Sequence, residues 1–150
     1  MSLTYGFKTP QDILDKVHRD ADLLDDEVTS DRLFNFVVTA YSLIDWISES
    51  RLASCSQKDA AQSFRESQPL KICGDIANAS KHFVLKRRKP ITSSAVSIQG
   101  WGCGRYGKGG WGVGEEQIEI VLNDGTRISG QQFVQDVLSV WAAFFAEHPI

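Results

Sequence analysis

The sequence predicts a mainly α domain of the α+β kind, in which an antiparallel helical bundle carries a β-meander before its last helix. Apolar residues recur at the helical period through the first 90 residues and again at the C-terminus. Between about residues 92 and 129, β-branched residues and a two-residue alternation replace that period. The 150 residues, 42% of them hydrophobic, suit one domain over 1–150 with an extension at about 91–129.

Two long helices are expected first. Pro10 opens the first helix, which points its aspartates outward and ends in the acidic turn Asp25-Asp26-Glu27. The second helix runs from an N-cap at Thr29 or Ser30 to about Ser50. Its polar side is expected to face solvent and includes Asn35, Thr39, Ser42 and Asp45. Among these, Asp45 is a candidate acidic partner, across a helix interface, for Lys71, Lys81 or His82.

Two shorter helices follow. Ser56 and Asp59 have the spacing of a capping box, which predicts a helix from Ser56 to about Glu66. Pro69 begins another helix, and Pro90 must end it.

The strands are expected next. Residues from Thr92 to Gln99 and from Ile118 to Leu122 predict two of them, and Asn123-Asp124-Gly125 predicts the turn that returns the chain through Thr126 to Ser129. Ser129 and Gln132 form a second capping box before the last helix. That helix should pack centrally, because its apolar residues are Phe133, Val134, Val137, Leu138, Trp141, Phe144 and Phe145.

Composition excludes several classes of protein. The net charge of −3 gives no general attraction to nucleic acid or anionic membrane. Three widely spaced cysteines indicate free thiols in a reducing cytosol, and no segment resembles an export signal or a bilayer span. We therefore expect a cytoplasmic protein without a membrane partner. No cluster has metal-ligand spacing, so neither a metal nor a cofactor is expected.

The helix after Pro69 gathers its polar groups on one side. At about 100° per residue, a single arc contains Lys71, Asp75, Asn78, His82 and Lys86. His82 is the candidate general acid or base, because its ordinary pKa lies near neutrality. Lys81, Lys86 and Arg87 belong to a basic run that can hold phosphate. The alternative is a solvated helix face without a function of its own.

The hexapeptide Ala77-Asn78-Ala79-Ser80-Lys81-His82 resembles the signature of the HEPN superfamily of helical bundles, which reads arginine, a polar residue, three variable residues and histidine. Asn78 and His82 match it, whereas Ala77 stands where the arginine belongs. In HEPN ribonucleases the resemblance implies metal-independent RNA cleavage, with histidine assisting the 2′-hydroxyl and arginine stabilising the phosphate charge. Without that arginine the resemblance favours a degenerate member that binds without cleaving. Asp75, two turns before His82 on the same side of the helix, is a separate candidate binding residue, directed at a partner helix or subunit.

A glycine-rich segment lies between the first two predicted strands, at residues 100–114. Its Gly-x-Gly-x-x-Gly is no dinucleotide fingerprint, because a strand follows it where a helix is required. Trp101 and Trp111 offer stacking surfaces and Arg105 a phosphate contact, as in proteins that bind single-stranded nucleic acid. The alternative is a hairpin tip that docks on the domain or on a second subunit.

These observations leave three functional hypotheses. The first is a non-enzymatic binding or interaction module of bacterial type, a homodimer with RNA as a candidate partner. The second is an endoribonuclease in which His82 is the base, Asn78 orients the substrate, and Lys81 together with the basic run from Lys86 to Lys89 holds phosphate. The third is binding of single strands by the glycine-rich segment.

Overall fold

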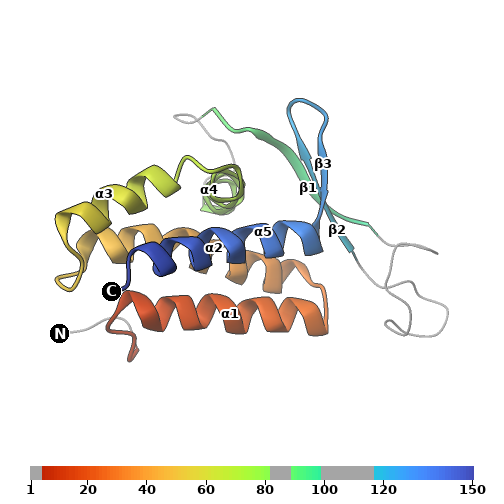
Figure 1. Cartoon of the computed structure of the whole chain (residues 1–150). Coiled ribbons are helices and arrows are strands. Elements are labelled where there is room, and N and C mark those ends of the chain that lie inside the picture. Colours follow the sequence, from red (N-terminus) through yellow and green to blue (C-terminus); the bar gives the residue numbers. More distant parts are fainter. Residues whose placement is uncertain (1–4, 82–88, 99–116) are drawn as a thin grey trace.

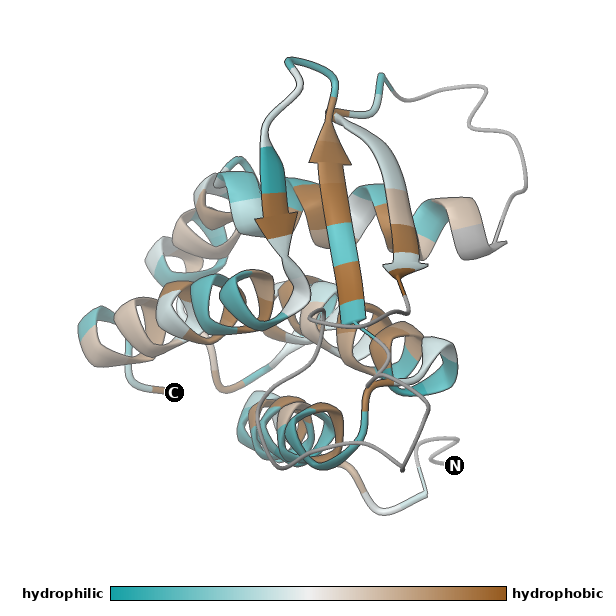
Figure 2. Cartoon of the chain, turned by 90° about the vertical axis from the view of Figure 1, so that its right-hand side faces the viewer, coloured by the Kyte–Doolittle hydropathy of each residue, from teal (hydrophilic) through white to brown (hydrophobic). Residues whose placement is uncertain are grey.

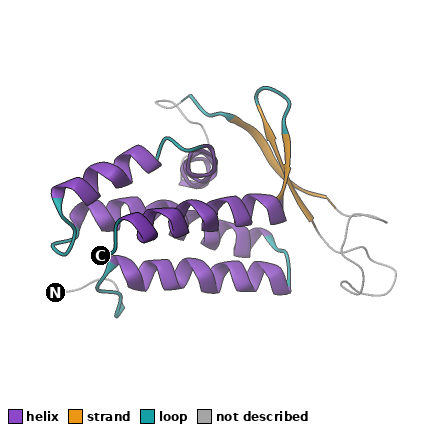
Figure 3. Ribbon diagram, viewed as in Figure 1, coloured by secondary structure: helices purple, strands orange, loops and turns teal. Residues whose placement is uncertain are grey.

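The computed structural model describes residues 5–81, 89–98 and 117–150. The elements in chain order are α1 (Pro10–Asp26), α2 (Ser30–Glu49), α3 (Cys55–Phe64), α4 (Gln68–Lys81), β1 (Thr92–Ile98), β2 (Gln117–Leu122), β3 (Arg127–Ser129) and α5 (Gly130–Glu147). The helices α1, α2 and α5 lie side by side, α4 crosses them, and the sheet stands at one end (Figures 1 and 3). The predicted fold class, a mainly helical domain with a small antiparallel sheet, is confirmed. In the described part of the chain, no helix is both long and apolar enough for a bilayer span.

Side-chain caps set where the helices begin. The Thr9 hydroxyl accepts the Asp12 N–H, and Asp12 Oδ2 accepts the Thr9 N–H in return, which closes a capping box on α1. Thr29 caps α2, one of the two predicted positions. For α3 the predicted box at Ser56 and Asp59 is wrong by two residues, because Ser54 and Gln57 form it instead.

The core is built from α1, α2, α4, α5 and one face of β2, with Ala61 from α3. Trp141 of α5 is fully buried, and its indole N–H donates to the Ala40 carbonyl of α2 at 3.2 Å. The rings of Phe36 and Phe133 meet edge to face, with centroids 6.3 Å apart, and this contact also joins α2 to α5. The last helix therefore packs centrally, as predicted.

The sheet has the order β1-β2-β3, with both pairs antiparallel. Along β2, Ile118, Ile120 and Leu122 are buried toward the helices, and the alternation is visible in Figure 2. On the other face, Arg127 of β3 donates to Glu119 at 2.8 Å. Gly130, the first residue of α5, lies very close to β2: a Cβ at this position would be 2.9 Å from Ile118 Cβ. This close approach brings the first turn of α5 against the start of β2.

The α1 cap should make the fold sensitive to acid. Hydrogen bonds from the backbone amides of Lys8 and then Thr9 lower the pKa of Asp12 below its ordinary value of 3.8. A folded pKa below the unfolded one contributes stability that is present above the unfolded value and is lost as the pH falls through the folded value. Between about pH 5 and about pH 3, Asp12→Asn should therefore lose less stability than the parent in urea titrations. Equal losses would show that Asp12 is not linked to folding.

Candidate functional site

On the polar side of α4, Asp75 is hydrogen-bonded to the segment that leads into β1. This carboxylate is only 3% exposed, and its Oδ2 accepts the backbone N–H groups of Ile91 at 2.8 Å and Thr92 at 3.0 Å. The same short segment is held from the other side by Asn123, whose backbone N–H donates to the Ile91 carbonyl and whose side chain donates to the Pro90 carbonyl. Asp75 therefore anchors the start of β1 to α4.

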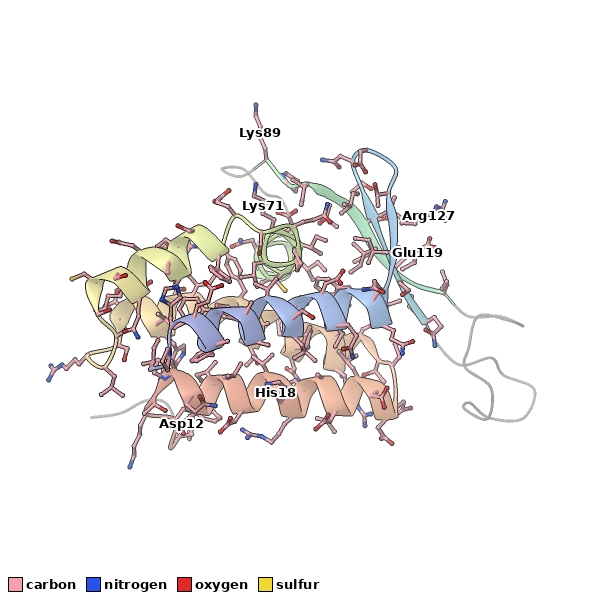
Figure 4. The ribbon with its side chains drawn as sticks, in the orientation of Figure 1. Asp12, His18, Lys71, Lys89, Glu119 and Arg127 are labelled. Atoms are coloured by element: carbon pink, nitrogen blue, oxygen red, sulfur yellow. The ribbon has the colours of Figure 1, made fainter. Side chains whose placement is uncertain are left out.

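The neighbouring polar residues of α4 also make local contacts. The Asn78 side chain is half-buried and donates to the Gly74 carbonyl, one turn back, at 2.7 Å. Lys71 forms an ion pair with Glu66 at 3.1 Å. Lys71 projects on the opposite side of the bundle from His18 of α1 (Figure 4). In the described residues, this side of α4 thus combines an anchoring carboxylate with short-range polar contacts.

Several predicted site residues lie outside the described residues. They are His82, Lys86, Arg87, Trp101, Arg105 and Trp111. Lys81 is the last residue of α4. The described candidates are Asp75 and Asn78, which share α4 but are bonded to different parts of the backbone.

The ion pair that Asp45 makes is not the one expected with Lys71. Asp45 forms an ion pair at 3.3 Å with Arg65, which follows α3 and also lies over the Tyr41 ring. Lys71 pairs with Glu66 instead. Through Arg65, the α3–α4 connection contacts α2 at this point.

A largely buried polar cluster joins α1 to α2. It includes residues that the sequence predicts to face solvent. Lys16 Nζ donates to Asp20 Oδ2 at 2.5 Å and to the Thr39 hydroxyl at 3.0 Å. The Thr39 hydroxyl lies 2.8 Å from Asp20 Oδ2 and 2.7 Å from the Asn35 carbonyl, either of which it can donate to. The prediction that Thr39 faces solvent is wrong, because α2 is covered by α1 on this side as well. The polar groups of this cluster find their hydrogen-bond partners within it, and these bonds hold the two helices in register.

A groove opens where four elements converge: the C-terminal half of α1, the first turn of α2, the start of β2 and the first turns of α5. Its volume is about 340 Å³. Its apolar lining is Ala21, Leu24, Val28, Leu33, Ile118, Val134 and Leu138. Its polar lining is Asp22, Asp25, Gln117, Gln131 and Gln135. We call this the α1–α5 groove.

An apolar interior with a few polar groups at the edge is typical of sites for small ligands, and about 300–1,000 Å³ is their usual size. Sequence reasoning missed the groove, because its residues come from two stretches, 21–33 and 117–138, that no motif links. The only signal was the acidic run at the end of the first helix. A second hollow, at the other end of α1, is more open and carries both charge signs, with Lys8 and Arg51 beside Asp45 and Glu49.

The described part of the chain has no group of three histidine, cysteine or acidic residues that could hold a metal ion. Its two free cysteines differ in exposure. Cys55 is exposed, whereas Cys73 of α4 is fully buried, and burial raises the pKa of the Cys73 thiol far above its usual range. Cys73 is therefore a core residue and not a nucleophile.

This difference gives a labelling prediction. Iodoacetamide at mildly alkaline pH should modify Cys55 in the native protein and leave Cys73 intact, because only thiolates react and, of these two described cysteines, Cys55 is the accessible one. Peptide mapping by mass spectrometry measures both sites, and urea should expose Cys73. Labelling of native Cys73 at the rate of Cys55 would contradict the buried position of α4.

Comparison with protein-family models, with curated proteins and with solved structures gives no significant match.

Proposed function

We propose that this chain is a non-enzymatic binding module and that its ligand occupies the α1–α5 groove. The observation that carries the proposal is the groove itself, an apolar hollow of about 340 Å³ with a polar edge on otherwise well-packed elements. Its walls are parts of helices and of the central strand, so it is formed before a ligand arrives. The homodimer and the cytoplasmic location expected from the sequence stay part of this proposal.

We propose ligand binding rather than RNA cleavage because Asp75 and Asn78 of α4 make hydrogen bonds that support the fold. Cleavage by a HEPN-like site would use the polar side of α4 around Asn78 and His82. Asp75, on that side, gives its Oδ2 to two backbone N–H groups, and the Asn78 amide donates to a carbonyl of its own helix. These roles support the fold without any contribution from a substrate.

A titration with hexanol, followed by heteronuclear NMR, tests the proposal. The amide signals of Leu24, Ile118 and Val134 should shift together and saturate. Gln135→Trp should weaken binding about tenfold or more, because an indole at the exposed groove edge competes with the ligand for the apolar interior. Ala142→Trp is the matched control: it adds the same ring at an exposed position of α5 outside the groove and should bind as the parent does.

Two results would contradict the proposal. One is a set of shifts centred on α4 instead of the groove. The other is equal hexanol affinity in Gln135→Trp and Ala142→Trp.

A further inference from the structure

Glutamine side chains supply uncharged polar groups at the edge of the α1–α5 groove. Gln131 and Gln135 are one turn apart on α5, on the same side of that helix as the groove residues Val134 and Leu138. Gln117, the first residue of β2, lines the same groove. A ligand in the groove therefore meets side-chain carboxamides beside aliphatic groups.

These carboxamides are available to a ligand. Within the described residues, no hydrogen bond involves the side chains of Gln117, Gln131 or Gln135. Gln132, which lies outside the groove, instead donates to Asp136 at 2.8 Å. Each carboxamide offers an acceptor oxygen and N–H donors. Another carboxamide pairs with both functions at once, because it carries the same donors and acceptor in the same arrangement.

The volume of the groove limits the size of the ligand. A water-sized group takes up about 30 Å³ in a liquid, so a groove of about 340 Å³ holds about ten non-hydrogen atoms. The apolar side chains of the described lining are aliphatic, and contact with them stabilises a ligand in proportion to the apolar area removed from water. An alkyl chain of about seven or eight carbons with one small polar head group therefore fills the groove.

We infer that the ligand of the α1–α5 groove is an aliphatic carboxamide of this medium length. The inference rests on the proposed function, since it names the class of ligand that the groove takes. The alkyl chain contacts Leu24, Ile118 and Val134, and the carboxamide pairs with Gln131 or Gln135 at the edge. Octanamide, which has about the required number of non-hydrogen atoms, is the reference probe.

Chain length tests the size of the ligand. In NMR titrations followed at the amides of Leu24, Ile118 and Val134, affinity should rise about fifteenfold from butanamide to hexanamide and again to octanamide, because each buried methylene adds about fourfold. From octanamide to decanamide the gain should fall below about threefold, since the added carbons extend beyond the groove. A rise that continues undiminished to decanamide would overturn the assigned length.

Nonan-2-one tests the head group, because it replaces the NH₂ of octanamide by a methyl group and keeps the carbonyl oxygen. Asp22 and Asp25 also line the groove, so both probes are uncharged. In Gln131→Met/Gln135→Met, the ratio of octanamide affinity to nonan-2-one affinity should fall about threefold to tenfold, because octanamide alone also loses the bond that its N–H donates. Gln132→Met, the matched control outside the groove, should keep the ratio of the parent.

The results separate this inference from the proposed function. Binding in the groove with the same affinity ratio in Gln131→Met/Gln135→Met and in Gln132→Met overturns the carboxamide assignment and leaves ligand binding in the groove standing. If no probe shifts the groove amides, hexanol included, both claims are overturned.

Discussion

Truncating Trp141 to alanine is expected to lower the free energy of unfolding by about 3–5 kcal/mol. The side chain is fully buried, and its ring meets Phe144 edge to face at 5.7 Å and Phe145 at 6.4 Å. Its removal leaves a large cavity at the centre of the bundle and takes the indole donor from the Ala40 carbonyl. For a domain of this size such a loss is a large part of the total stability.

Urea denaturation followed by circular dichroism measures the effect. Trp141→Phe serves as the graded control, because it keeps most of the ring but removes the indole N–H, and it should cost about 1–3 kcal/mol. Ala142→Trp on the exposed side of α5 should change stability little. A loss below about 1 kcal/mol for Trp141→Ala would contradict a central position for α5.

Replacing Asp75 with alanine is expected to cost about 2–4 kcal/mol, because two half-buried backbone N–H groups lose their shared, buried acceptor. The Thr92 hydroxyl beside them is buried without a described partner, so the segment cannot easily compensate. The amides of Ile91 and Thr92 should also exchange with solvent faster, since their protection depends on this carboxylate.

The control is chosen to separate the acceptor from the charge. Asp75→Asn keeps a carbonyl oxygen that can accept the same two bonds, so it should retain most of the stability that Asp75→Ala loses. Asn78→Ala removes only a contact within α4 and should cost less than about 1.5 kcal/mol. If Asp75→Ala were as stable as the parent, Asp75 would not anchor β1.

Much of the fold could be predicted because local chemistry determines it. Pro10 and Thr29 mark where α1 and α2 begin, and the alternation along β2 with the turn at Asn123 to Gly125 defines the hairpin. The cap of α3 was misplaced because Ser54 and Ser56 are both good N-caps. Only the folded chain shows which one meets the partner residue three positions on.

The site was harder to predict because it depends on tertiary contacts. Helical spacing placed Asp75 correctly on the side of Asn78, but it could not show that the segment after Pro90 would cover that side. The same limit applies to Thr39 and Asp20, which become buried when α1 meets α2. The α1–α5 groove needs residues from both halves of the sequence, and no local pattern reports their meeting.

The central claim is that ligands bind in the α1–α5 groove and not on the polar side of α4. Intermolecular nuclear Overhauser effects with bound hexanol test it most directly. The account predicts contacts from the hexyl chain to the methyl groups of Leu24, Ile118 and Val134. Contacts instead to the methyl groups of Ala77 and Ala79 on α4, with none in the groove, would contradict it.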